Sequence, residues 1–154
     1  MQSLDVVLLD TTAQYCYDSP MKKATINWLK SADYDLKTAA SLLRSKRYLY
    51  VIFMCHLSLE KTLKAILSEA LSELPPYTHN LNRLLELGGI ALPEELQSFV
   101  NAINLQSVPT RYPEDFTRLS KELNAKTAAE YMRQTKRIVQ WLKKNIPHLK
   151  SKRS

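Results

Sequence analysis

Glycine is scarce in this chain: only two of the 154 residues are glycine, and they are adjacent at Gly88 and Gly89. Helix-forming residues dominate instead, and after residue 20 no stretch alternates apolar and polar residues in the way that is typical of a half-buried strand. We therefore predict an all-α fold. At 154 residues the chain is long enough to bury a core as a single domain without disulfides or metal.

Cysteine is equally rare, with Cys16 and Cys55 alone. Cys55 falls inside a predicted core helix and Cys16 in an irregular leader, so we expect no disulfide, which suits a reducing cytosol. No pair of His, Cys or carboxylate residues has a spacing typical of metal ligands. The sequence thus predicts neither a metal site nor a cofactor.

Long apolar runs are missing as well. The longest uncharged apolar run, residues 48–59, is far shorter than the roughly 20 residues that cross a bilayer. The N-terminus contains Asp5 and no basic segment ahead of its apolar stretch, which argues against a signal peptide. We expect a cytoplasmic protein without membrane association.

Acidic residues are outnumbered, since 22 Lys and Arg stand against 15 Asp and Glu, for a net charge of +7. Three of the acidic residues precede Lys22, so the chain from Lys22 onward carries +10. A basic chain of this kind is compatible with an anionic partner such as nucleic acid or a nucleotide phosphate, although it does not require one.

The chain divides into an unassigned N-terminal extension (1–20), a helical domain (21–147) and a basic tail (148–154). Apolar spacing predicts helices over 21–46, from 48 to about 74, over 81–87, from 93 to before Pro109, and from about 124 onward, with residues 110–115 as a loop held by two prolines. We expect three long and two shorter helices in an up-and-down bundle. For the last helix, Thr127 and Glu130 have the spacing of a capping box.

The helix expected from residue 48 is the centre of the prediction. Its apolar and small residues recur at steps of three and four, which places them on one face of a core helix. Glu60 and Lys64 are four apart in the favourable acid-before-lysine order. The simplest interpretation is a solvated salt bridge of a few tenths of a kcal/mol; the alternative is a charged cluster on which other functional residues converge.

Four segments, in this order, resemble the HEPN family of helical nucleotide-binding domains found in prokaryotes and in some large eukaryotic proteins. Residues 28–36 are similar to the opening helix of the family and residues 60–65 to its central helix. Residues 78–81, Thr-His-Asn-Leu, are similar to its Thr-His-Asp-Leu turn, and residues 111–114, Arg-Tyr-Pro-Glu, to its Arg-Tyr-Pro-Asp segment. The resemblance covers roughly residues 21–147.

The resemblance implies a homodimeric helical bundle, often encoded beside a minimal nucleotidyltransferase as one half of a two-protein, toxin-antitoxin-like system. Ribonucleases of the family use an Arg and a His separated by four to six residues. That motif is absent, because eight and ten residues separate His56 and His148 from the nearest upstream arginines, and His79 has none nearby. Asn80 also stands where the family turn has an acidic residue. We therefore lean against an enzyme.

Five residues are the candidate ligand-binding set. His79 can cap a helix or donate to a phosphate or base, with about equal support for each. Arg111 can bind a phosphate with its planar guanidinium or form a structural ion pair with Glu60 or Asp35. Tyr112 can stack on a base or pack on the bundle. The set is completed by Glu60 and Lys64, and His56 is expected to be partly buried or to face a dimer partner.

Three functions remain open. The first is a non-catalytic module that binds a nucleotide or RNA and partners a nucleotidyltransferase; the second is a metal-independent ribonuclease acting as a dimer; the third is a purely structural dimer. Homodimerisation is expected because several aromatic residues fall partly off the core-facing positions of the first two helices, and exposed apolar surface marks interfaces. These residues are Trp28, Tyr34, Tyr48, Tyr50 and Phe53.

Overall fold

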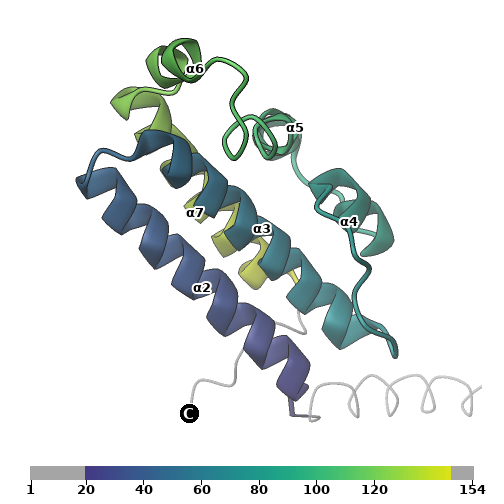
Figure 1. The fold of residues 1–154 in the computed structure, drawn as a ribbon. Coiled ribbons are helices and arrows are strands. Elements are labelled where there is room, and N and C mark those ends of the chain that lie inside the picture. The colour runs from purple at the N-terminus through teal and green to yellow at the C-terminus, as the bar shows by residue number, and fades with distance from the viewer. Residues whose placement is uncertain (1–19, 147–154) are drawn as a thin grey trace, which may run out of the picture.

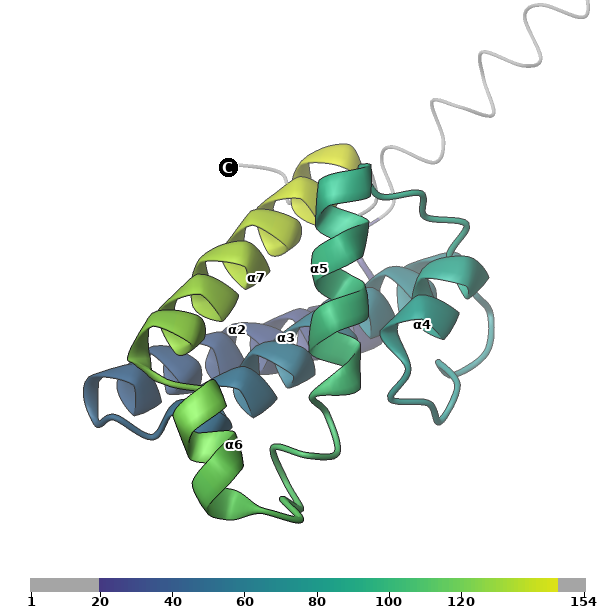
Figure 2. The ribbon, with the colours of Figure 1, turned by 90° about the horizontal axis from the view of Figure 1, so that it is seen from above.

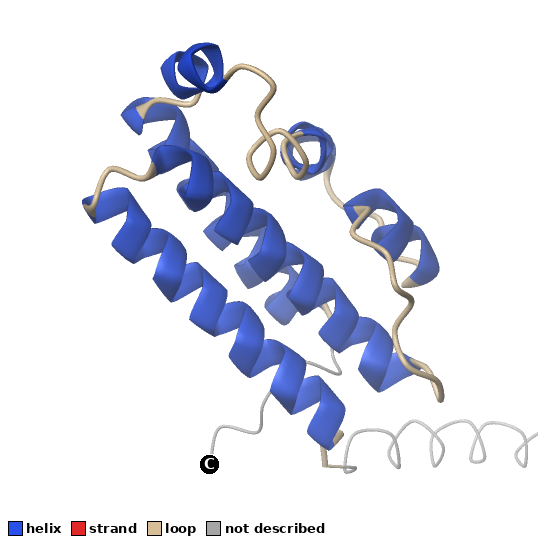
Figure 3. Cartoon of the chain, viewed as in Figure 1, coloured by secondary structure: helices blue, strands red, loops and turns tan. Residues whose placement is uncertain are grey.

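The structure, a computed structural model, describes residues 20–146, and this part of the chain forms six helices and no strand (Figure 3). The all-α prediction is confirmed. The predictions for the leader and for the tail from residue 148 fall outside the described residues. The helices are α2 (Lys23–Arg44), α3 (Tyr48–Ala70), α4 (Leu81–Leu87), α5 (Glu94–Leu105), α6 (Phe116–Glu122) and α7 (Ala125–Asn145).

The central element is α3, which contacts each of the other five described helices. It lies antiparallel beside α2 with α7 packed behind, while α4, α5 and α6 follow one another along its other side (Figures 1 and 2). Because neighbours surround it, 14 of its 23 residues are buried. Burial raises the pKa of the Cys55 thiol in this core to about 11, so that side chain stays protonated and packs as an apolar group.

The amphipathic helices around α3 bury one face each, as their apolar spacing predicts. On α5 the buried residues are Leu96, Val100 and Ile103, and on α7 six residues at helical spacing are buried. The outward faces are polar and charged. None of the helices between residues 20 and 146 combines the length and the apolar character needed to cross a bilayer.

A lysine clamps the far ends of α2 and α3 together. Lys22 Nζ donates to the carbonyl oxygens of Ser68 (3.1 Å), Glu69 (3.0 Å) and Leu71 (2.9 Å), which lack partners within α3 because the helix ends there. Thr25 Oγ1 donates to the Glu69 carboxylate at 2.6 Å. The charge of Lys22 also complements the negative end of the helix dipole, so the clamp stabilises the antiparallel pair.

The turn between α2 and α3 is closed by a lysine in a left-handed conformation. Lys46 has φ 61°, and Arg47 N donates to Leu42 O at 2.9 Å, the six-residue hydrogen bond of a Schellman motif. That position favours glycine, since a Cβ crowds the backbone there. The short connection keeps α2 and α3 side by side.

Two helix predictions are corrected. No helix was predicted between the loop of residues 110–115 and residue 124, but α6 lies there, a seven-residue helix in which no residue is fully buried, so it has no apolar stripe to reveal it. The predicted capping box of Thr127 and Glu130 does not form: Asn124 is the cap of α7, and its Oδ1 accepts from Thr127 N at 3.1 Å. Glu130 instead pairs with Arg133 one turn further along.

Candidate functional site

Glu60 and Lys64 form a buried ion pair on α3. Lys64 Nζ lies 2.8 Å from Glu60 Oε1, and the two residues are 7% and 4% exposed. The expectation of a solvated surface pair is therefore wrong, because the neighbouring elements enclose this face of α3. Lys64 Nζ also lies 5.6 Å from the centroid of the Trp28 ring on α2, a cation–π distance. The carboxylate, the ammonium and the indole form one packed unit.

His79 reaches the same carboxylate from the connection that precedes α4. Its Nδ1 lies 3.0 Å from Glu60 Oε2 and 3.1 Å from Oε1, so Nδ1 carries the proton and donates to the carboxylate. The His79 side chain is 65% exposed. The helix-capping role considered for it belongs to Asn80, whose Oδ1 accepts from Asn82 N and Arg83 N. His79 thus links a buried charge to the surface.

His56 lies one turn before Glu60 and is 2% exposed. Its Nδ1 is 3.9 Å from Glu60 Oε2, and its buried Nε2 has no hydrogen-bond partner. Burial lowers the pKa of the imidazole below 6.5; the Glu60 carboxylate and Asn104 oppose this shift, whereas Arg111 and His79 add to it. His56 is therefore neutral at pH 7, and it is buried within the monomer rather than facing outward.

Arg111 approaches α3 from the loop after α5. Its guanidinium carbon lies 5.4 Å from the centroid of the Phe53 ring, and its Nε donates to Ser107 O at 2.8 Å. Neither predicted ion pair forms: Asp35 pairs with Lys61 at 2.6 Å, and Glu60 is bound by Lys64 and His79. Across the described residues the two terminal nitrogens of Arg111 have no hydrogen bond or ion pair.

Tyr112 is 74% exposed, so it does not pack down on the bundle. The structure therefore joins Glu60, Lys64 and His79 by direct contact, places Arg111 within the electrostatic reach of His56, and leaves Tyr112 on the adjoining surface. Sequence reasoning did not assign the aromatic supports of the two cations. The usable signal was the spacing of Phe53, His56, Glu60 and Lys64, which places them on one face of α3.

Within the described residues, no group of three His, Cys, Asp or Glu side chains is placed to hold a metal ion. The polar side chains of the site are the cations Lys64 and Arg111, the buried carboxylate of Glu60, and the imidazoles of His56 and His79. Among them His79 and Arg111 are accessible.

The arrangement is that of a small helical domain whose central helix carries a buried charged cluster, which an accessible imidazole and a guanidinium approach from neighbouring segments. A sequence profile of the HEPN domain matches residues 26–146, and the chain belongs to the HEPN family. No curated protein matches the sequence.

Solved structures share the fold. TT1696 from Thermus thermophilus is 20% identical, with a TM-score of 0.70 over 80% of this chain and 98% of that one. ST0689, described as an archaeal HEPN homologue, is 23% identical, with a TM-score of 0.64 over 81% of this chain and 99% of that one. At these identities the likeness establishes the fold alone.

Proposed function

We propose that this HEPN domain binds a nucleotide or nucleic-acid phosphate at the surface formed by Arg111 and His79. The observation that carries the proposal is the state of Arg111: a half-buried guanidinium, fixed on Phe53 and by Ser107 O, whose two terminal nitrogens lack a protein partner among the described residues. A planar fork held in this way is suited to bidentate binding of a phosphate.

The neighbouring charges support an anion at this place. Glu60 is the nearby carboxylate, and it is neutralised by Lys64 and bonded by His79. Taken together, Lys64, Arg111 and Glu60 leave one positive charge. His79 Nε2 and the exposed Tyr112 then supply a hydrogen bond and a stacking surface for the rest of a nucleotide.

Titration of the purified protein with ATP, GTP and short RNA tests the proposal. Arg111→Ala should abolish binding and change stability little, because no carboxylate is stranded. Arg111→Lys should also weaken binding, since lysine keeps the charge and loses the fork. Arg83→Ala is the matched control, because Arg83 pairs only with exposed Glu86. Absence of binding at millimolar ligand, or a large loss of stability in Arg111→Ala with binding retained, contradicts the proposal.

We further propose that the domain forms a homodimer and partners a minimal nucleotidyltransferase in a toxin-antitoxin-like system. Support comes from membership of the HEPN family and from exposed aromatic residues on α2 and α3. Tyr34 on α2 is 72% exposed, and Tyr50 on α3 is 52% exposed. Co-expression with the product of an adjacent nucleotidyltransferase gene, followed by purification through a tag on one protein, tests the partnership. Separate elution of the two proteins would argue against it.

A ribonuclease activity is the second candidate, favoured by one contact. Glu60 fixes Nδ1 of His79 as the donor, which leaves Nε2 as a base oriented by a buried carboxylate. On bound RNA, Nε2 would take the proton of a 2′-hydroxyl as that oxygen attacks the adjacent phosphorus, while the departing 5′-oxygen takes a proton from water. An RNA cleavage assay decides: activity that persists in His79→Ala removes His79 as the base.

A further inference from the structure

We infer that the ligand is a single-stranded nucleic acid that extends from Arg111 over the end of the bundle formed by the α2–α3 turn and α6. This inference rests on the proposed function, because Arg111 anchors one end of the path. It adds a second set of side chains, which lie outside the Glu60 cluster.

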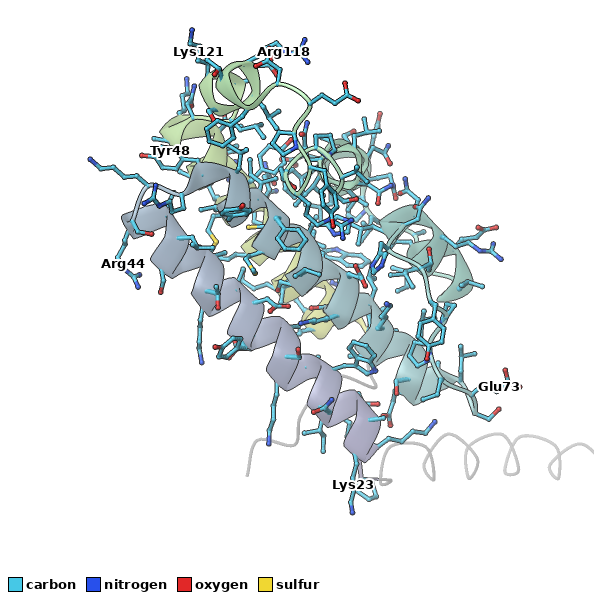
Figure 4. The ribbon with its side chains drawn as sticks, in the orientation of Figure 1. Lys23, Arg44, Tyr48, Glu73, Arg118 and Lys121 are labelled. Atoms are coloured by element: carbon cyan, nitrogen blue, oxygen red, sulfur yellow. The ribbon has the colours of Figure 1, made fainter. Side chains whose placement is uncertain are left out.

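Basic side chains gather at this end of the molecule. Figure 4 shows Arg44, Arg118 and Lys121 around the start of α3, opposite the end that carries Lys23 and Glu73. The end includes the turn after α2 and the first turn of α7, and α6 packs against α3. Six exposed basic residues stand here against three acidic ones, Glu114, Asp115 and Glu122. The basic residues are Arg44, Lys46, Arg47, Arg118, Lys121 and Lys126.

The local acidic residues do not cancel this charge. Six basic and three acidic residues leave this end with a net charge of +3, and Asp115 Oδ1 accepts from Arg118 N at 2.9 Å as the cap of α6. Glu122 lies 3.7 Å from Arg118 in an exposed pair, which solvent screens strongly. Among the described residues, Lys46, Arg47, Lys121 and Lys126 form no salt bridge. They remain available for phosphates.

Lys46 lies in the turn between α2 and α3. It occupies a backbone position, φ 61°, at which a lysine is strained and glycine is favoured. Side-chain packing does not explain it, because Lys46 is exposed and its only hydrogen bond in the described structure is the backbone N–H to Leu43 O. The Schellman turn after α2 accounts for this backbone conformation, and the exposed side chain adds a positive charge beside Arg44 and Arg47.

Exposed aromatic residues lie on the segment that joins Arg111 to α6. Tyr112 is 74% and Phe116 is 65% exposed. Two large rings left in water, four residues apart and between Arg111 and Arg118, form a surface on which unpaired bases can stack. A duplex hides the faces of its bases, so rings used in this way select a single strand.

Binding should therefore depend on the length of the strand. We expect fluorescence anisotropy to show that a single-stranded oligonucleotide of about 12 nucleotides binds at least tenfold more tightly than ATP, and more tightly than a duplex of the same sequence. RNA and DNA strands of matched sequence establish whether the 2′-hydroxyl contributes. Equal affinity for the oligonucleotide and for ATP would overturn the inference and leave the proposed function standing; absence of binding for both would overturn the proposed function itself.

Charge variants locate the path. In Lys46→Gly with Lys121→Gln, oligonucleotide affinity should fall and the slope of log affinity against log salt should flatten by about 1.4, because two phosphate contacts are lost. The first change relieves strain, and Lys121 is exposed, so neither change should unfold the protein, which a thermal melt of the variant checks. The control, Lys23→Gln with Lys30→Gln, removes the same charge from the exposed surface of α2. Equal effects of the two double variants would contradict the proposed path.

Aromatic variants test the stacking surface. Phe116→Ala should weaken oligonucleotide binding about tenfold and leave ATP binding within about twofold, because Tyr112 remains to stack on the base of ATP. Tyr77→Ala is the control, since Tyr77 is fully exposed in the connection between α3 and α4. Light scattering on the same samples separates base stacking from self-association. If Phe116→Ala changes the molecular mass and not the oligonucleotide affinity, this ring belongs to a protein interface and the inference is wrong.

Discussion

The same acid-before-lysine spacing occurs on neighbouring helices with opposite environments. Asp33 and Lys37 on α2 pair at 2.8 Å with side chains 52% and 78% exposed. Glu60 and Lys64 on α3 pair at the same distance, but their side chains are only 5% and 9% exposed. In water such a pair contributes a few tenths of a kcal/mol, whereas removal of one partner of a buried pair strands a charge. Position in the fold, rather than spacing, decides what each pair does.

Lys64→Ala should therefore destabilise the protein far more than Lys37→Ala. We expect Lys64→Ala to lower the free energy of unfolding by about 3 kcal/mol, because Glu60 would keep only His79 as a partner and Trp28 would lose its cation. Lys37→Ala should change it by at most a few tenths of a kcal/mol. Urea denaturation of the two variants measures both values. Equal losses would mean that the Glu60 cluster is solvated in solution.

Through His56, the stability of the protein should depend on pH. Burial lowers the pKa of His56 below 6.5 in the folded state, so below that pH the unfolded chain binds more protons than the folded one. The contribution to stability is present above pH 6.5 and is lost as the pH falls towards the folded pKa. His56→Leu, which replaces an imidazole whose Nε2 has no partner, should lose less stability between about pH 7 and pH 5 than the parent protein.

Thermal melts of the two proteins across this pH range provide the measurement. His79→Gln serves as the comparison, because His79 is exposed and bonded to the same carboxylate. Parallel pH profiles for the parent and His56→Leu would mean that His56 is protonated in the folded state as readily as in the unfolded chain.

The helices differ in how far their residues predict them. Helices α2, α3 and α7, of 22, 23 and 21 residues, were predicted because each has several turns of apolar spacing against the core. Helix α6 has seven residues and none fully buried, so it depends on its cap, Asp115, and on a partly buried Leu119. Pattern reasoning finds a helix through its buried stripe and misses one that lacks it.

The candidate site shows the same limit. The sequence predicted that Glu60 and Lys64 pair, because both lie on one helix. It could not predict that His79, 19 residues away, bonds Glu60, or that Arg111 rests on Phe53, since these contacts depend on how separate segments pack. The resemblance to the HEPN family pointed to His79 and Arg111 as candidate residues, and only the tertiary structure shows which side chains they contact.

Substitutions at Asn124 and Glu130 test which residue caps α7. Asn124→Ala should lower the free energy of unfolding by about 1 kcal/mol, because the N–H of Thr127 loses its acceptor. Glu130→Ala should have a clearly smaller effect, since Glu130 makes only exposed contacts with Arg133 and Gln134. Chemical denaturation distinguishes the two caps. A larger loss for Glu130→Ala than for Asn124→Ala would restore the capping box that the sequence suggested.

The exposed aromatic residues of α2 and α3 determine how much apolar surface is free for a dimer interface. Five aromatic residues of α2 and α3 were expected to lie partly off the core. Trp28 and Phe53 are covered in part by Lys64 and Arg111, and Tyr48 packs against the core, so these three add little free apolar surface. Tyr34 and Tyr50 remain exposed on adjacent helices. A twofold interface through them would bury the same patch of each subunit.

The mass of one chain is 17.7 kDa. Light scattering at tens of micromolar should give twice this mass for the dimer that we propose. Tyr34→Lys with Tyr50→Lys should shift the mass to that of the monomer, because two desolvated ammonium groups in an interface of about 800 Å² per partner would oppose association. Tyr77→Lys, on the connection after α3, is the matched control and should leave the dimer intact. A monomer mass for the parent protein at this concentration would rule out the dimer. A dimer that survives the double substitution would move the interface away from α2 and α3, since both tyrosines lie exposed on these helices and neither is needed by the core.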